Sequence, residues 1–265
     1  MGNTSIVKLG GSVITDKKEG RAVLRTRRIT EIAREIRSVL SKKQNMRLVL
    51  LYGVGSFAHP LAHRYRLLDR PLSRRTFSDA GETIAATREL GTRLCALLLE
   101  AGIPVVPLQT SSFARVRRGR LQFTDLSILE TILKKGGVPL LGGDVVFSDT
   151  ERTAIASADT LAVELSRKLK PARLYFASDT DGVYAAFPPR RGERPVARLT
   201  RAGVREVLKH GRVKAKRTDV TGAMPGKLAA LLAARKTTAI IFNGDTKKVL
   251  ADVLLGKKHG TQIVL

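Results

Sequence analysis

Disulfides, long apolar runs and aromatic side chains are scarce or missing in this 265-residue chain, which has one cysteine, no tryptophan and 5% aromatic residues. The single cysteine, Cys95, can form no internal disulfide, and its place on the apolar side of a predicted helix assigns it to the core rather than to a nucleophilic role. The longest apolar runs are much shorter than a membrane span, and the N-terminus shows no secretion signal. We therefore expect a cytoplasmic protein without redox chemistry or a membrane segment.

Acidic residues are also few, because 48 lysines and arginines stand against 23 aspartates and glutamates, a net charge of +25. Such a field favours anionic partners, which include nucleotides and phosphorylated metabolites as well as nucleic acids. The denser basic runs, residues 114–120 and 190–217, lack the interleaved aromatics of a single-strand stacking platform. We interpret both runs as solvated surface and expect no nucleic-acid partner, and a basic nucleic-acid-binding protein is kept as the alternative from another class.

Apolar runs rich in β-branched residues alternate with segments of helical periodicity along the chain. The predicted strands are residues 4–11, 46–54, 103–108, 138–147 and 172–184, and the predicted helices are residues 25–43, 56–67, 81–102, 125–137 and 156–170. This alternation predicts an α/β fold whose mainly parallel sheet has helices on both faces and binds ligands at the carboxyl ends of its strands. Polar-tipped hairpins are predicted over residues 111–125, as a candidate lid, and 142–157.

No internal repeat or low-complexity linker divides the chain. The best candidate for a boundary between two parts of the chain lies at residues 168–173, within "RKLKPAR". We therefore expect two lobes, residues 1–170 and 171–265, which share one continuous sheet in a single structural domain.

Three glycine-rich segments each follow a predicted strand: "KLGGS" at 8–12, "YGVGSFAHP" at 52–60 and "LLGGDVV" at 140–146. Glycine lets backbone N–H groups approach a ligand closely, and phosphate is favoured where a helix follows. Tight turns alone could use the same glycines, but three such segments in one parallel sheet indicate a shared cleft for an anionic ligand. None of them matches the P-loop or the GxGxxG dinucleotide fingerprint.

Two further segments carry polar residues of interest. "SDTDGVY" at 178–184 could bind metal, ribose hydroxyls or an adenine amine, or could be a simple Asx-turn. In "DVTGAMPGKL" at 219–228, Lys227 is predicted in the first turn of a helix, where the helix dipole disfavours a cation unless an anion is also present. Lys227 is therefore a better anion-ligand candidate than an average lysine.

Taken in order, these segments resemble the amino acid kinase superfamily over nearly the whole chain, and within it most closely the isopentenyl phosphate kinases. The segments that carry the resemblance are "VKLGGSVITDK", "YGVGSFAHP", "LLGGDVV", "ASADTLAVELS", "SDTDGVY", "TGAMPGKL" and "HGTQI". The resemblance implies an open three-layer αβα sandwich, commonly a homodimer, with the phosphate acceptor in the N-terminal lobe and Mg²⁺-ATP in the C-terminal lobe. It also implies the reaction, in which isopentenyl phosphate, or the related dimethylallyl phosphate, is phosphorylated by ATP to the diphosphate used in isoprenoid biosynthesis.

The resemblance further implies roles for individual residues. The catalytic set would be Lys8 and Lys17 on the transferred phosphoryl group, His59 on the acceptor phosphate, Lys227 on the ATP phosphates and Asp159 orienting Lys8 and Lys227. The acceptor would be bound by Val54, Gly55, His59 and Gly143. ATP would be bound by Lys8, Leu9, Gly10, Gly11, Ser12, Gly55, Asp179, Asp181, Gly182, Tyr184, Gly222, Met224 and Lys227, while Mg²⁺ would be held mainly by phosphate oxygens and water rather than by protein ligands.

The chain departs from the family pattern at Val54, Ala58 and Ala223, where smaller residues are usual, and Gln109 and Thr110 are polar for a wall around a hydrocarbon tail. The tail is expected against residues 84–98 and 107–113. These departures bear on the identity of the acceptor, so a kinase acting on another phosphate or phosphonate, of the fosfomycin kinase type, is the alternative within the enzyme class.

Overall fold

The computed structural model describes residues 4–16, 22–186, 189–190, 192–210 and 223–265. The helices are α1 (Gly11–Ile14), α2 (Thr26–Lys42), α3 (Gly55–Arg64), α4 (Arg74–Glu100), α5 (Ser127–Lys134), α6 (Ala158–Leu169), α7 (Arg201–His210), α8 (Ala223–Leu232) and α9 (Val249–Leu254), with a 3₁₀ turn, η2 (Thr110–Ser112). The strands are β1 (Thr4–Leu9), β2 (Thr15–Asp16), β3 (Val23–Leu24), β4 (Arg47–Tyr52), β5 (Val105–Leu108), β6 (Ala114–Arg117), β7 (Arg120–Phe123), β8 (Val138–Gly142), β9 (Asp144–Phe147), β10 (Thr153–Ala156), β11 (Arg173–Ser178), β12 (Arg198–Thr200), β13 (Thr238–Asn243) and β14 (Thr261–Val264).

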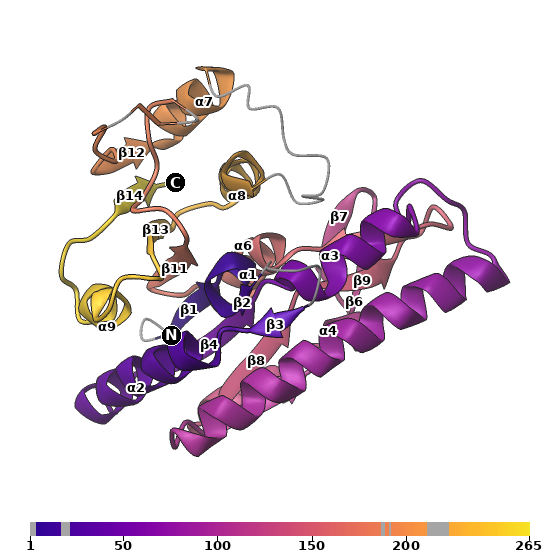
Figure 1. The fold of residues 1–265 in the computed structure, drawn as a ribbon, viewed down its shortest axis with the longest axis horizontal. Coiled ribbons are helices and arrows are strands. Elements are labelled where there is room, and N and C mark those ends of the chain that lie inside the picture. Colours follow the sequence, from indigo (N-terminus) through magenta and orange to yellow (C-terminus); the bar gives the residue numbers. More distant parts are fainter. Residues whose placement is uncertain (1–3, 17–21, 187–188, 191, 211–222) are drawn as a thin grey trace.

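Eight strands form one sheet in the order β12-β14-β13-β11-β1-β4-β8-β5. Every neighbouring pair is parallel except β13 and β14. Four strands come from each predicted lobe, and β1 and β11 join them at the centre, as Figure 1 shows by the meeting of indigo and orange ribbons. The predicted mainly parallel, continuous sheet is confirmed.

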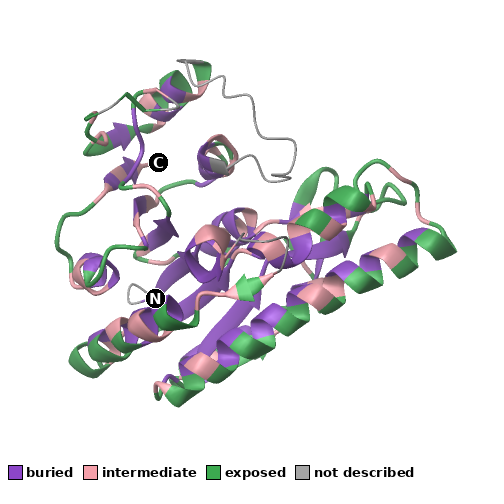
Figure 2. Cartoon of the chain, in the orientation of Figure 1, coloured by how far each residue is buried: buried purple, intermediate pink, exposed green. Residues whose placement is uncertain are grey.

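Helices cover both faces of the sheet, because its strands alternate apolar side chains between the two sides. Val7 and Leu9 pack with α2, α4 and α9 in one core, whereas Ile6 packs with α5, α6, α7 and α8 in the other. Figure 2 shows the central strands buried throughout, as a parallel sheet covered on both faces requires. Cys95 lies in the first core and burial raises the pKa of its thiol, which confirms the predicted core position.

Several predicted boundaries differ from the structure. The predicted helix 81–102 begins earlier, at Arg74, because Ser73 caps it by accepting the N–H of Thr76 at 3.1 Å. The predicted strand 138–147 divides at Gly143 into β8 and β9, and β9 leaves the sheet to pair with β10. Both predicted hairpins are present, as β6–β7 and β9–β10.

Candidate active site at the carboxyl ends of the strands

Four glycines extend the sheet by one residue beyond the carboxyl ends of its strands. Each donates its backbone N–H to a carbonyl at the end of the neighbouring strand: Gly10 to Ala177, Gly53 to Leu9, Gly143 to Tyr52 and Gly244 to Ser178, over 2.7–3.0 Å. Because β11, β1, β4 and β8 are neighbours, the three predicted glycine-rich segments lie side by side at one edge, where a parallel sheet places its ligands.

The first two glycine segments pack backbone against backbone. A Cβ atom on Gly11 would lie 2.6 Å from the Cα of Gly55, and one on Gly53 would lie 2.8 Å from the amide nitrogen of Gly11. Gly55 also has φ of +48°, a conformation that side chains disfavour. Close packing therefore explains these three glycines before any ligand is considered, and it fixes the β1 and β4 loops against one another.

The centre of the edge is an ion cluster of two lysines and one aspartate. Lys8 Nζ lies 3.1 Å and Lys227 Nζ 3.0 Å from the same oxygen, Oδ1 of Asp159. All three residues are buried, at 5–8% exposure. The Lys227 ammonium also lies 5.3 Å from the centroid of the Phe176 ring, a cation–π distance. Among the described residues, a carboxylate shared by two ammonium groups leaves one buried positive charge without a matching anion.

Local structure accounts for the position of each member. Lys8 follows the period of β1, so its side chain is on the face of Ile6, which α6 and α8 cover. Asp159 is in the first turn of α6, where Ser157 caps the helix and a negative charge is favoured. The described part of α8 begins at Ala223, so Lys227 is its fifth residue, one turn later than predicted.

The cluster shifts the pKa values of its members. Burial by itself raises the pKa of Asp159, but Lys227 and Lys8 outweigh it and hold that pKa at about 2. For Lys227, burial is the largest effect and lowers the pKa, Asp159 opposes it, and Lys8 adds to it, so the pKa falls to about 8. The site is thus built to gain stability from a further anion.

Of the predicted acceptor residues, Val54, Gly55 and His59 lie on the adjoining β4–α3 segment, and Gly143 lies between β8 and β9. His59 is half-buried in the second turn of α3, and His63, one turn later, is exposed. Val54 and Ala58 are buried within the core, so the extra bulk at these two positions is taken up by packing. Lys17 and Gly222 lie outside the described residues, and the structure describes no side chain for Ala223.

The predicted nucleotide segment forms a turn after β11. Asp179 and Asp181 are exposed, and Asp181 accepts a 2.8 Å hydrogen bond from the amide of Asn243. Thr261 closes the turn from β14 by accepting the N–H of Val183 at 2.7 Å, and a Cβ atom on Gly182 would collide with it. The closing "HGTQI" segment is thus explained by its contact with this turn, while Tyr184 and Met224 are buried and Leu9 is fully buried in the core.

The polar residues of the predicted tail wall are occupied by other protein groups. The amide nitrogen of Gln109 donates to the buried Asp144, and its oxygen accepts a 2.8 Å bond from Arg88. Thr110 donates to the carbonyl of Gly142 at 2.7 Å. Burial raises the pKa of Asp144, and donors from Ser111 and Gln109 oppose that shift. The polarity of Gln109 and Thr110 is therefore satisfied within the protein.

A small apolar cluster, separate from the two cores, lies between α3, α4 and the β9–β10 hairpin. Its members are Ala62, Leu67, Ala80 and Val145, with Tyr65, Ile84 and Ile155 packed against them. By contrast, Leu90, Leu94 and Leu98 of α4 belong to the core that packs on α2. Of the predicted wall 84–98, only the Ile84 end is thus outside that core.

Among the described residues, no group of three or more histidine, cysteine, aspartate or glutamate side chains could hold a metal ion. Nor does any helix in the described part of the chain have the length and apolar character that a membrane crossing needs.

Comparison with known proteins agrees with this geometry. The model of the amino acid kinase family matches residues 3–243. The chain therefore belongs to the amino acid kinase family. Within that family its relatives include the isopentenyl phosphate kinases of Methanothermobacter thermautotrophicus, 35% identical over 97% of this chain and 98% of the relative, and of Methanocaldococcus jannaschii, 30% identical over 98% of each. A solved structure of isopentenyl phosphate kinase matches with a TM-score of 0.80 at 28% identity, covering 98% of this chain and all of the other.

These matches confirm the predicted family, the αβα fold and the phosphotransferase class. Asn243, Gly244 and Phe176 belong to the site but were not predicted from the sequence. Asn243 and Gly244 form the turn dipeptide "NG" directly after an apolar run. Such a dipeptide predicts another loop at the carboxyl edge of the sheet. Nothing in the sequence marks Phe176 as the ring beneath Lys227.

Proposed function

We propose that this chain transfers the γ-phosphoryl group of ATP to isopentenyl phosphate, giving isopentenyl diphosphate. The observation that carries the proposal is the buried cluster in which Lys8 and Lys227 share one carboxylate oxygen of Asp159. Its surplus positive charge is at the edge of the sheet where ligands bind. The relatives, which are isopentenyl phosphate kinases, support the choice of a phosphate monoester as acceptor.

On the donor side, Lys227 and Lys8 contact the ATP phosphates and the transferred group in this proposal. The backbone N–H groups of Gly11 and Ser12 add main-chain donors, while that of Gly10 is bonded to Ala177, and Met224 and Gly222 lie over the phosphates. The turn with Asp179, Asp181, Gly182 and Tyr184 frames the nucleoside. Mg²⁺ would be held mainly by phosphate oxygens and water, since Asp159 is engaged by two lysines.

On the acceptor side, His59 anchors the phosphate, and Val54, Gly55 and Gly143 place backbone groups around it. The hydrocarbon tail, of isopentenyl or dimethylallyl phosphate, lies against the small cluster that includes Ala62, Ala80 and Val145, because that cluster is apolar and adjoins α3. Lys17 approaches the transferred group from the segment after β2.

Such a site suits phosphoryl transfer, which needs in-line placement and positive charge on the transferred oxygens rather than covalent catalysis. The acceptor phosphate is ionised near neutral pH, so no strong base is required and His59 acts as an anchor. The electrostatic field of a chain with a net charge of +25 also attracts the two strongly anionic substrates.

In the same proposal, residues 1–170 bind the acceptor and supply the contacts of a homodimer, and residues 171–265 bind ATP. If the two lobes had the opposite roles, the nucleotide would lie away from the turn at residues 178–184. Cross-linking with an azido-ATP followed by peptide mapping distinguishes these arrangements.

The test is a kinase assay with ATP and Mg²⁺ against isopentenyl phosphate, dimethylallyl phosphate, fosfomycin and N-acetylglutamate. We expect turnover with the first two, and loss of it by about 10²- to 10³-fold in Lys8→Met. Lys42→Met, an exposed lysine at the end of α2, serves as the matched control and should keep full activity. Turnover with fosfomycin alone would identify the chain as the alternative, a kinase of the fosfomycin type. Nucleic-acid binding with steep salt dependence and no kinase activity would make the protein a nucleic-acid-binding one.

A further inference from the structure

Arg25 joins two elements of the site that belong to different halves of the sequence. It precedes α2, where its carbonyl accepts the N–H of Ile29, while its own N–H donates to the carbonyl of Ile14 at the end of α1. Its guanidinium donates to the carbonyl of Ser12 at 2.8 Å and pairs with Asp245 at 2.6 Å. Arg25 is thus bonded to α1, which begins within the first glycine segment, through both its backbone and its side chain.

The hydrogen bond from Arg25 to Ser12 satisfies a backbone carbonyl of α1. A helix of one turn leaves its carbonyls without intrahelical partners. The carbonyl of Gly11 is taken by the N–H and hydroxyl of Thr15, and those of Ser12 and Ile14 are taken by Arg25. Arg25 therefore holds the orientation of the segment whose N–H groups face the proposed ATP phosphates.

The other partner, Asp245, belongs to the loop after β13. Its N–H donates to the side-chain oxygen of Asn243 at 2.8 Å, and the amide of Asn243 donates to Asp181 at 2.8 Å. A continuous path of bonds thus runs from Ser12 through Arg25, Asp245 and Asn243 to the turn proposed to frame the nucleoside.

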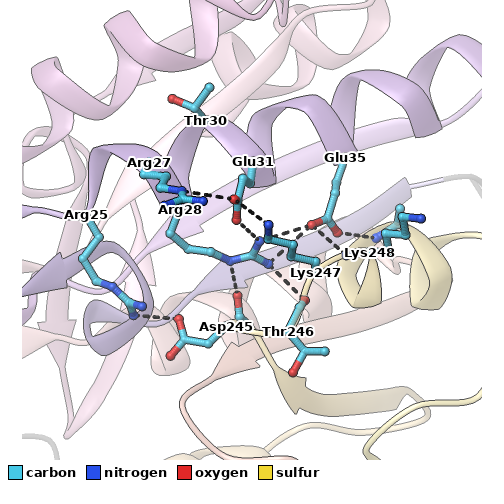
Figure 3. Close-up of polar contacts among 12 residues, drawn as sticks. Arg25, Arg27, Arg28, Thr30, Glu31, Glu35, Asp245, Thr246, Lys247 and Lys248 are labelled. Atoms are coloured by element: carbon cyan, nitrogen blue, oxygen red, sulfur yellow. Dashed lines mark hydrogen bonds and ion pairs between the residues drawn. The ribbon is translucent and has the colours of Figure 1, made fainter.

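The loop that carries Asp245 is held firmly. Figure 3 shows Arg28, three residues after Arg25, extending from α2 toward this loop, and its guanidinium donates to the carbonyls of Gly244 at 2.7 Å and Thr246 at 3.2 Å. Asp245 lies between these two anchored residues. The anchored loop therefore gives the Arg25 side chain a fixed point from which to hold Ser12.

We propose that Arg25 and Asp245 are positioning residues for the nucleotide: together they fix the phosphate-binding segment 10–12 relative to the nucleoside-binding turn 178–184. The proposal rests on the proposed function, since it needs ATP at these two segments. Neither residue contacts a reacting atom. Both side chains are about one-third exposed, at 32% and 35%, so the pair adds little to global stability. Its loss affects alignment, and a displacement of about 1 Å can lower phosphoryl transfer by about 10²-fold.

The experiment compares Arg25→Met and Asp245→Asn with Arg27→Met. Arg27 is the matched control, because it lies two residues away, is 89% exposed and pairs with Glu31 of its own helix, α2. We expect Arg25→Met to raise the KM for ATP and the calorimetric Kd of a non-hydrolysable ATP analogue by about 10-fold, with an unchanged acceptor KM and melting temperature. Asp245→Asn should have a smaller effect in the same direction, and the double variant should be no worse than Arg25→Met alone.

The proposal would be overturned by an unchanged Kd for the ATP analogue, by an equal rise in both KM values, or by additive effects in the double variant. A melting temperature that falls together with affinity would also overturn it, because that result indicates a purely structural role. The analogue titration needs no acceptor. If the wild-type protein binds the analogue but fails to phosphorylate isopentenyl phosphate, the proposed acceptor is wrong while the positioning role is still tested.

Discussion

The structure contains two buried ion clusters with opposite composition. At the carboxyl edge, two lysines share the single carboxylate of Asp159. Beside α2, the single guanidinium of Arg28 pairs with two carboxylates, Glu31 at 3.1 Å and Glu35 at 3.4 Å (Figure 3). The central ion of each cluster, Asp159 or Arg28, is buried, so burial alone does not distinguish a functional cluster from a structural one.

The difference lies in how completely each cluster is satisfied. Glu35 also accepts the N–H groups of Lys248 and Ala251, and Arg28 donates to two backbone carbonyls, so this cluster ties α2 to the segment from β13 into α9. In the lysine cluster, one carboxylate faces two ammonium groups, and the surplus charge is at the edge of the sheet. A saturated cluster stabilises the fold, whereas an unsaturated cationic one is prepared for an anion.

The largest expected effect is that of Asp159→Asn. Without the carboxylate, Lys8 and Lys227 are two buried like charges, so we expect a loss of about 3–5 kcal/mol in the free energy of unfolding. Kinase activity should fall by about 10³-fold, since both lysines lose their orientation. Urea denaturation and initial rates measure the two effects. A variant with native stability would mean that the lysines are not charged together in the empty site.

Lys227→Met separates function from stability within the same cluster. The substitution keeps the length of the side chain and its contact with Phe176 while it removes one of the two like charges. We expect activity to fall by about 10²- to 10³-fold with an unchanged or higher melting temperature. Strong destabilisation would instead assign Lys227 a structural role like that of Arg28.

Arg28→Met is the converse test in the other cluster. It leaves Glu31, Glu35 and two backbone carbonyls without their main donor, and we expect a loss of about 3 kcal/mol in the free energy of unfolding. At temperatures where the variant is folded, kcat and the acceptor KM should stay within about threefold of the wild type. A selective loss of kcat would show that the two clusters are coupled more directly than their contacts indicate.

The smallest expected effect is a pH dependence from Lys227. Because its pKa is lowered to about 8, the free protein loses this charge as pH rises through that value. We expect kcat/KM for ATP to fall by about 10-fold between pH 8 and 9.5. Between about pH 8 and 10.5 the unfolded chain keeps a proton that the folded chain has lost, so the contribution of this group to stability rises as activity falls. In Lys227→Met the alkaline limb assigned to this lysine should be absent. If it persists there, another group causes it.

Much of the fold and part of the site could be predicted from local pattern. Strands of continuous apolar residues alternating with amphipathic helices determine a parallel sheet, and glycines after three strands mark its carboxyl edge. Lys8 was recognisable because a lysine in a buried strand needs a partner. The start of α4 and the division of β8 from β9 were not, since the first depends on a cap eight residues before the predicted start and the second on a strand that leaves the sheet.

The interpretation of polar residues near the acceptor depended on structure. From sequence, Gln109 and Thr110 argue against an apolar pocket, because their side chains are polar. In the structure their polar groups bond to Asp144, Arg88 and Gly142, and the apolar cluster around Ala80 and Val145 is formed by other elements. Residue type alone does not say where a hydrogen bond is made.

By itself, the sequence determined the family, the parallel sheet and the lysines and glycines at its edge, since each is written in a short segment with its own physical constraint. Only the tertiary structure decided that Lys8 and Lys227 share one oxygen of Asp159, and that Arg25 connects Ser12 to Asp245. These contacts join residues separated by many elements, and a charge acquires its pKa and its role from the neighbours that folding brings to it.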